Sequence, residues 1–361
     1  MGKFTPMNYR LKNAIVLSLP VQILLVSWIT RYPEVIENYY SLGIYPYISA
    51  VLRWLYGWIP FSLGDILYTL LLLVTGRYLY LHWLEIRTKP LSFLRDLLVV
   101  FSIAYFSFHL LWGLNYYRQP LSKTLGLRNS YTTEELTAFT AVLTEKTNEL
   151  QAKLSEADSI QVVVPFKRQE IFEMVSSDYR PLPTEFPEFE YSNPSVKGSL
   201  YSLALTYMGY GGYLNPFTLE AQVNQKIPMS RFPVVSCHEI AHQLGYAAEN
   251  EANFIGYLAA LNQGDPRLRY SALSYALGYC LSELRALDEE LFEEAYSRVN
   301  PGIKKDYEEL SAFWKAYENP LEPIFKLTFN AFLKANNQAA GIRSYNLVVA
   351  LLVAYHEESP L

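Results

Sequence analysis

The sequence predicts an α+β chain in which N-terminal transmembrane helices precede a mostly helical domain with a small sheet. Long apolar runs are confined to the first 120 residues, whereas helical apolar spacing occurs over 130–157 and again after Pro233. Between them, residues 199–224 alternate in polarity and are broken by glycines, which favours short strands with a turn at Gly209–Gly212. We therefore divide the chain into a membrane region, residues 1–118, and a second domain, residues 119–361.

The composition fits a chain that partly contacts lipid. Of its 361 residues 51% are hydrophobic and only 18% are charged, below the quarter or so that is usual for soluble proteins. The net charge of −5 and the lack of a basic cluster give no support to nucleic-acid binding. The two cysteines, Cys237 and Cys280, cannot build a disulfide framework. One bridge between them is the alternative, but we expect two buried free thiols.

Three apolar segments are candidate spans of a lipid bilayer. They are AIVLSLPVQILLVSWIT at 14–30, SLGDILYTLLLLVTGRYLYLHWL at 62–84 and LLVVFSIAYFSFHLLWGL at 97–114. In the second segment, Ser62 and Asp65 form a possible helix cap, which would place Asp65 at the water interface. The sequence therefore predicts about three transmembrane helices.

The distribution of basic residues predicts the orientation of these spans. Three basic residues precede the first span, Lys3, Arg10 and Lys12, and three lie in the 85–96 loop, Arg87, Lys89 and Arg95. The longer 31–61 loop has only two, Arg31 and Arg53. The positive-inside rule then puts the N-terminus and the 85–96 loop in the cytoplasm. With three spans, the chain after about residue 118 lies outside it.

The second domain opens with a helix-capping pair, Thr132 and Glu135. Residues 161–166, QVVVPF, resemble a short strand. Four prolines predict irregular structure over 180–194. From Pro233 to about residue 356 the pattern is mostly helical.

The motif that carries chemistry is HEIAH, in which His238 and His242 lie four residues apart on either side of Glu239. On a helix, residues i and i+4 lie on the same face, so both imidazoles can bind one Zn²⁺ ion. Glu239 can then reach the water on the metal without being a ligand. This is the arrangement of H-E-x-x-H hydrolases, in which the glutamate is the general base.

The third protein ligand requires a bend in the chain. A metzincin layout would need a histidine at position 248, which is Ala248. Glu249 and Glu251 are the nearest acidic residues, and an unbroken helix could not return Glu251 to the metal. We expect the motif helix to stop at Gly245 and a second helix, capped by Asn250, to begin at Glu251. We favour Glu251 over Glu249 as the ligand.

The stretch HEIAH followed by ENEANFIGY resembles the compact gluzincin peptidases, including the ImmA/IrrE-like group. In that group the glutamate of an E-A-N stretch is the third zinc ligand, and the resemblance carries this role to Glu251. Nearly the whole chain also resembles a family of bacterial membrane proteins known only as a domain of unknown function. The matching pieces are Trp112–Arg118, Asn215–Asn224, Cys237–Tyr257 and FLKANNQAAGIRSYNLVVALL. The resemblance implies a zincin-like domain anchored in the inner membrane of a bacterium.

A peptidase also needs groups that hold its substrate. We expect an edge strand at 217–224, just before the motif helix, to pair with an extended peptide, and this nominates Thr218, Glu220 and Asn224 as substrate-binding residues. We choose Tyr345 as the donor that stabilises the oxyanion, with Arg343, Tyr275 and Tyr279 as alternatives.

The function predicted from these residues is a multi-pass, membrane-anchored zinc metallopeptidase that acts on a peptide or protein substrate outside the cytoplasm. The alternative is a sensor or scaffold of the same fold that binds zinc but cleaves nothing. A zinc site inside the bilayer is disfavoured, because the sequence around the motif has no apolar run near 18 residues.

Overall fold

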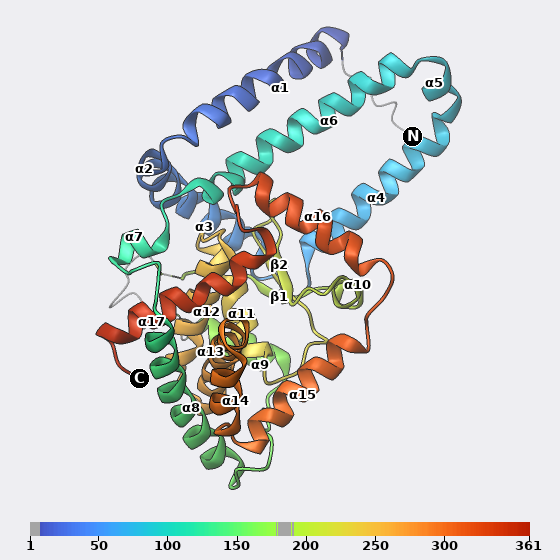
Figure 1. Cartoon of the computed structure of the whole chain (residues 1–361). Helices are drawn as coiled ribbons and strands as arrows, with labels where there is room; N and C mark the ends of the chain where they lie inside the picture. Colours follow the sequence, from blue (N-terminus) through green and yellow to red (C-terminus); the bar gives the residue numbers. More distant parts are fainter. Residues whose placement is uncertain (1–7, 178, 180–188, 190) are drawn as a thin grey trace.

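The computed structural model describes residues 8–177, 179, 189 and 191–361 (Figure 1). Its elements are α1 (Tyr9–Ile29), α2 (Pro33–Val35), the π-helix η1 (Ile36–Ile44), α3 (Tyr45–Tyr56), α4 (Leu63–Leu81), α5 (Trp83–Thr88), α6 (Pro90–Leu111), the 3₁₀-helix η2 (Gly113–Tyr117), α7 (Leu121–Leu125), α8 (Thr133–Ser155), α9 (Arg168–Ser177), β1 (Val196–Gly198), α10 (Ser202–Met208), β2 (Gly212–Leu214), β3 (Ala221–Val223), α11 (Phe232–Gln243), α12 (Glu249–Leu261), α13 (Pro266–Leu287), α14 (Glu289–Ser297), α15 (Pro301–Lys315), α16 (Glu322–Ala335), the 3₁₀-helix η5 (Gly341–Leu347) and α17 (Val348–Glu358). The chain is mostly helical with one small sheet, as the sequence predicts.

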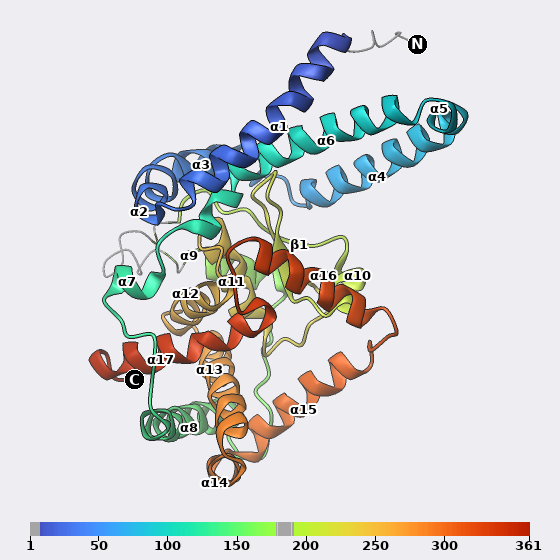
Figure 2. The same cartoon turned by 45° about the horizontal axis from the view of Figure 1, so that its top comes forward.

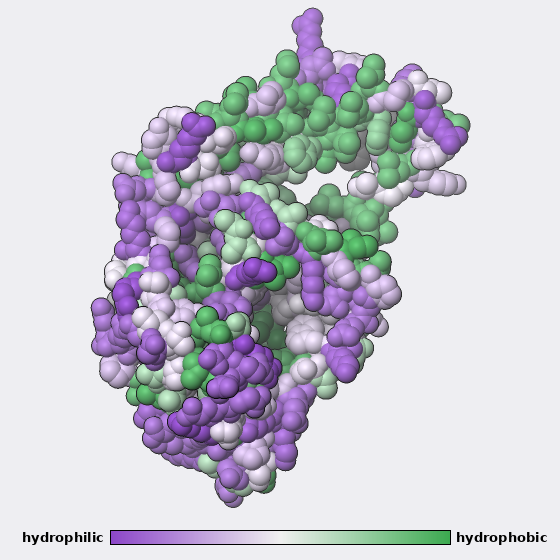
Figure 3. Space-filling view, in the orientation of Figure 1, coloured by the Kyte–Doolittle hydropathy of each residue, from purple (hydrophilic) through white to green (hydrophobic). Residues whose placement is uncertain are grey.

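Three helices, α1, α4 and α6, project from the body of the molecule (Figures 1 and 2). Among the described helices, α1 and α6 are long and apolar enough to cross a membrane. Helix α4 covers the second predicted span, but it is not among the described helices that are long and apolar enough to cross a membrane. The structure therefore supports two candidate spans rather than three. Hydrophobic residues gather over the projecting helices in Figure 3, while the far end of the body is mostly hydrophilic.

The segment between α1 and α4 packs on the body. Tyr45, at the start of α3, is fully buried in a small apolar cluster that also contains Trp112, Leu214 and Ala247. This cluster joins residues on both sides of position 118. The predicted boundary at residue 118 therefore lies beside an apolar cluster to which both sides contribute.

The sheet has three short strands in the order β1-β3-β2. Strand β3 is central: it pairs in parallel with β1, with Val196 opposite Ala221, and antiparallel with β2, with Leu214 opposite Ala221. The expectation of an edge strand at 217–224 is therefore wrong, because both sides of β3 are already paired. The edge strands are β1 and β2, and β2 begins at Gly212, the last residue of the predicted glycine-rich turn.

Two other local predictions need correction. Residues 161–166 form no strand, although Val162 and Val164 are buried in the core. Residues 202–208, expected to be extended, form α10, which ends at Gly209 with a positive φ of 81°. Most of the predicted irregular stretch 180–194 lies outside the described residues.

The remaining helices form the main core, in which α12 and α13 pack against α11 and α8 packs against α13. The capping box predicted at the start of α8 is present, with Thr132 and Glu135 each bonded to the other's backbone. Cys237 and Cys280 are both buried and form no disulfide. This core fixes α11, which carries the HEIAH motif.

Candidate metal centre

The motif helix α11 ends in a turn that reverses the chain. Gly245 has a φ of 90°, a conformation that glycine adopts without strain. Its N–H donates to His242 O at 2.9 Å, and Tyr246 N–H donates to Ala241 O at 3.2 Å, which is the Schellman pattern of a helix C-terminus. The predicted stop at Gly245 is confirmed, and it returns the chain toward the face that carries the two histidines.

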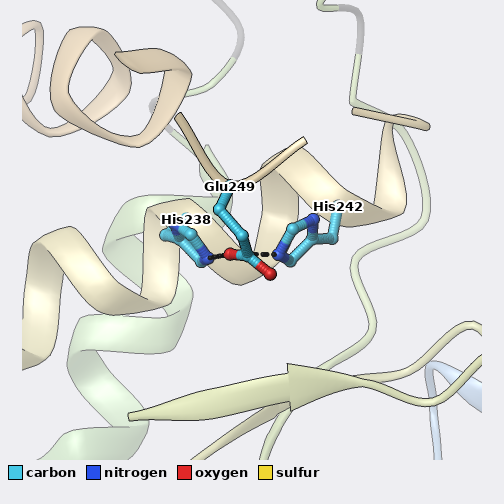
Figure 4. Close-up of side chains that lie close together, drawn as sticks. All are labelled: His238, His242 and Glu249. Carbon is cyan, nitrogen blue, oxygen red and sulfur yellow. Dashed lines mark ion pairs between the residues drawn. The ribbon is translucent and has the colours of Figure 1, made fainter. Parts of the chain in front are cut away.

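Helix α12 starts immediately after this turn and brings Glu249 to the imidazoles (Figure 4). Glu249 Oε2 lies 3.4 Å from His238 Nε2 and 3.6 Å from His242 Nε2. The ligand atoms of these buried residues all lie within 4.8 Å of one another. Two nitrogens and one carboxylate oxygen therefore converge on a point that one metal ion could occupy.

Glu251, the ligand that we expected, points elsewhere. Its Oε1 accepts a hydrogen bond of 2.7 Å from the N–H of Leu121, at the start of α7. The error lies in where α12 begins: the helix starts at Glu249 after an extended Ala248, and Asn250 does not cap it. Because each helical residue turns by about 100°, the two glutamates face opposite sides. The structure thus favours Glu249, our second choice.

Neighbouring groups orient the imidazoles. His242 Nδ1 lies 2.7 Å from Tyr246 O, so Nδ1 donates its proton to this carbonyl and Nε2 is the ring nitrogen that faces the cluster. Asn253, one turn after Glu249, contacts His238 and is itself held by Tyr275, whose hydroxyl donates to Asn253 Oδ1 at 2.6 Å. Asn253 was not predicted to be part of the site. Its position in the E-A-N stretch, one helical turn after Glu249, was the available signal.

Burial and charge shift the titration of this cluster. The two imidazoles hold the pKa of Glu249 well below its usual range, although burial alone would raise it. Burial lowers the pKa of His238. For His242, the interactions with Glu249 outweigh burial and raise the pKa to about 9. Glu249 is therefore ionised at neutral pH, as a metal ligand must be.

Glu239 faces the same cavity without joining the cluster. Burial, reinforced by Glu249 and opposed by His242, raises its pKa to about 8. A Cβ atom at Gly212 would lie 2.4 Å from Glu239 Oε1, so only glycine leaves room for the carboxylate against β2. Glu239 Oε2 is buried and has no hydrogen-bond partner among the described residues. It is a buried carboxyl group close to the candidate metal ligands that is not one of them.

The cluster opens into a cavity of about 1070 Å³, and Figure 3 shows the body hollowed in this region. Its lining includes His238, Glu239, His242 and Glu249, the backbone of β2, and many aromatic side chains. Trp112 from the N-terminal half and Phe332 from α16 contribute to one wall. A cavity of this size and apolar character is typical of a ligand-binding site.

Tyr345, chosen as the oxyanion donor, lines this cavity and lies beside Glu249. Burial, and then the Glu249 carboxylate, raises the pKa of its hydroxyl, so it remains a donor at neutral pH. The alternatives Tyr275 and Tyr279 also line the cavity, but their hydroxyls are bonded around Asn253. Arg343 is exposed and is not part of the lining.

The three residues nominated for substrate binding lie outside the cavity. Glu220 is fully buried, forms an ion pair of 2.5 Å with Lys197 and accepts the N–H groups of Leu63 and Gly64 at the start of α4. Thr218 donates to Glu220, and Asn224 Nδ2 donates to Tyr210 O at 3.0 Å. These contacts are structural, and that prediction is corrected: β2 is the strand beside the cluster.

Side chains of the N-terminal half donate hydrogen bonds to backbone carbonyl oxygens at the C-terminal end of the motif helix. Tyr45 and Ser49 hydroxyls donate to Gln243 O at 2.9 and 3.0 Å. Trp112 Nε1 donates to His242 O at 3.3 Å, and Arg118 donates to Gly245 O at 3.1 Å while it is paired with the buried Glu37. The match at Trp112–Arg118 was noted in the sequence, but its contact with the motif helix was not anticipated.

The chain is a mostly helical protein with apolar helices in its N-terminal part. It also contains a buried group of two histidines and a glutamate that could hold a metal ion. The model of a family described as "Protein of unknown function (DUF3810)" matches residues 40–353, and the chain belongs to this family. Searches of curated proteins and of solved structures found no significant match.

Proposed function

We propose that this chain is a membrane-anchored, zinc-dependent metallopeptidase with a gluzincin-like site. The observation that carries the proposal is the convergence of His238, His242 and Glu249 beside a buried Glu239 that is not one of them. A cluster that only held the fold together would have no use for an additional carboxylate facing the cavity.

The residues present fit a zinc ion. Glu249 Oε2 is buried and forms no hydrogen bond with the described residues, and both Nε2 atoms point toward it. Two imidazole nitrogens and one carboxylate oxygen are ligands typical of catalytic zinc, which keeps a further position open. When bound there, zinc would polarise a substrate carbonyl and lower the pKa of a water molecule.

The chain's own residues supply the remaining steps. Glu239 accepts the proton of the attacking water at its carboxylate and later donates it to the leaving amine. The hydroxyl of Tyr345 donates to the oxygen that becomes negative during attack. The backbone of β2, an edge strand that lines the cavity, aligns an extended peptide by β-pairing.

The decisive variant is Glu239→Gln in the full-length chain. We expect it to keep one zinc per chain and to lose about 10²–10⁴-fold of its activity, because general acid–base catalysis is removed. Metal analysis and cleavage of a library of quenched fluorescent peptides measure the two effects. Glu149→Gln, the same change on the exposed side of α8, is the control.

Two outcomes would contradict the peptidase. A purified wild-type chain without stoichiometric zinc would remove the metal site. A chain that binds zinc but cleaves no peptide, with or without Glu239, would favour the alternative of a non-catalytic zinc-binding sensor or scaffold.

The proposed location is the inner membrane of a bacterium, with the metal centre outside the cytoplasm. We include α4 as a third span beside α1 and α6, since its leucines from Leu70 to Leu73 and Val74 are more than half exposed. The positive charges before α1 and around 85–96 support this orientation.

A pair of C-terminal fusions tests this topology. Alkaline phosphatase, which folds only outside the cytoplasm, should be active, and green fluorescent protein exported in unfolded form should be dark. The reverse result would place the metal centre inside the cell.

A further inference from the structure

Helix α16 presents apolar side chains on two sides. Phe329 and Phe332 line the cavity. On the outside, Leu321, Ile324 and Leu327 are 56%, 56% and 69% exposed. Their spacing of three residues keeps them near one another along the helix. Exposed apolar side chains that form one contiguous patch mark an interaction surface.

Helix α10 continues this apolar surface. Leu200, Leu203 and Tyr207, in and just before the helix, are 57%, 50% and 45% exposed. Asn319 Nδ2, in the loop before α16, donates a hydrogen bond of 2.8 Å to Tyr207 O in α10. Tyr210, after α10, packs on Phe329 of α16 with ring centroids 5.1 Å apart. We call the exposed side chains of Leu200, Leu203, Tyr207, Leu321, Ile324 and Leu327 the α10–α16 face.

This face continues into the base of α4. Asp65, in the first turn of α4, accepts the N–H of Leu200 at 2.7 Å. One turn later, Thr69 Oγ1 lies 2.6 Å from the hydroxyl of Tyr201. The exposed leucines of α4 begin at the next residue, Leu70. Figures 1 and 2 both show α10 and α16 on the side of the body from which α4 projects.

We propose that the α10–α16 face docks on the surface of the lipid bilayer that holds α1, α4 and α6. The inference rests on the membrane placement of the proposed function but not on peptidase activity. Helix α16 has 14 residues, about 21 Å of helix, which is too short to span and suits a helix lying in the interface. Continuity with α4 identifies lipid, rather than a second copy of the chain, as the occupant.

The docked face determines where the cavity opens. Phe332 on the inner side of α16 and Phe108 near the end of α6 lie 6.4 Å apart between ring centroids, and both line the cavity. With the outer side of α16 on lipid, this wall of the cavity lies at the bilayer surface. For the proposed peptidase, this position would favour a substrate segment next to a transmembrane helix, a consequence on which the docking itself does not depend.

Single cysteines that carry an environment-sensitive fluorophore test the docking. Leu203→Cys and Leu327→Cys probe α10 and α16, and Leu72→Cys probes the exposed side of α4. Val142→Cys on α8, 45% exposed and apolar, is the matched control. The buried Cys237 and Cys280 stay in place, and the unsubstituted chain sets the labelling background. Each full-length variant is measured in detergent and after reconstitution into vesicles.

In vesicles we expect lipids with a quencher near the headgroup to reduce emission from probes at 203 and 327, and aqueous iodide to lose access to them. A probe at 142 should show neither effect. If a probe at 72 is quenched by lipid while those at 203 and 327 behave like the one at 142, docking alone is overturned. If the probe at 72 is quenched neither by these lipids nor by lipids that carry a quencher on the acyl chain, the membrane placement fails as well. A third outcome is that the probes at 203 and 327 are shielded from iodide in detergent and are not quenched by lipid in vesicles. This outcome would indicate that a second copy of the chain covers the face, and it would also overturn the proposal.

Discussion

At the level of single residues, two glutamates separated by one position have different roles. Glu249 lies against both imidazoles, whereas Glu251 binds the N–H of Leu121. Burial raises the pKa of Glu251 to about 7, so near neutral pH much of it is protonated. A glutamine there resembles the neutral form, whereas a glutamine at 249 removes the charge that would bind a cation.

These differences predict the outcome of paired substitutions. Glu249→Gln should lower zinc content well below one per chain, and Glu251→Gln should retain one zinc. Metal analysis of the two purified variants, each checked by thermal unfolding, measures this. Full zinc in Glu249→Gln together with loss of zinc in Glu251→Gln would reverse our assignment of the third ligand.

The sequence indicated His238, Glu239 and His242 by spacing alone, and it indicated the bend by Gly245. It could not distinguish Glu249 from Glu251, because that choice depends on a shift of two residues in the start of α12. Ala248, which precedes α12, has no side chain that could signal a cap. The orientation of Glu251 depends on α7, which is distant in sequence.

At the level of elements, the site depends on the close approach of α11 and α12. A Cβ atom at Gly256 would lie 2.8 Å from the backbone nitrogen of His238. Helix α12 can thus pack directly on the backbone of the motif helix. The separation of these two helices sets the distance between Glu249 and the histidines.

Gly256→Ala should therefore push α12 away from α11. We expect a loss of about 1–3 kcal/mol in the free energy of unfolding from overpacking, together with weaker zinc binding. Denaturant unfolding and zinc titration measure the two effects. Gly76→Ala in α4, where a Cβ would meet no atom within 4 Å, is the control and should not destabilise the chain, because Ala is favoured over Gly in a helix by about 0.5–1 kcal/mol. Equal behaviour of the two variants would contradict a role for the close approach.

Long helices were easier to predict than short strands. The cap at Thr132 and the helical pattern after Pro233 are local signals, and the structure confirms both. Strands of three residues carry little pattern, so α10 was read as extended and residues 161–166 as a strand. Whether β3 is central or at an edge depends on β1, which the sequence did not indicate.

At the level of the whole molecule, residues of the two halves pack together around the C-terminal end of α11. Side chains of the first 118 residues bind the carbonyl oxygens of His242, Gln243 and Gly245. The pair of Arg118 and Glu37 is buried there. A fragment of residues 119–361 would lose these donors and expose the apolar surface that they cover.

We expect this fragment to unfold at a lower temperature than the full-length chain in the same detergent and to hold less zinc, since each lost partner of a buried polar group costs about 1–3 kcal/mol. Arg118→Ala in the full-length chain is the companion test, because it leaves Glu37 buried without its charge partner and should cost about 3–5 kcal/mol. Unchanged thermal midpoints in both would show that the second half folds independently.

The hydrogen bonds from the N-terminal half to the carbonyl oxygens at the end of α11 affect how the chain folds during its synthesis. The ribosome makes the chain from its N-terminus, so Tyr45, Trp112 and Arg118 emerge before His238 and His242. Their donor groups are therefore already synthesised when the later segment folds. A nascent chain whose leading helices had not yet inserted would lack these donors, and the proposed hydrolase would stay incompletely assembled until insertion was complete.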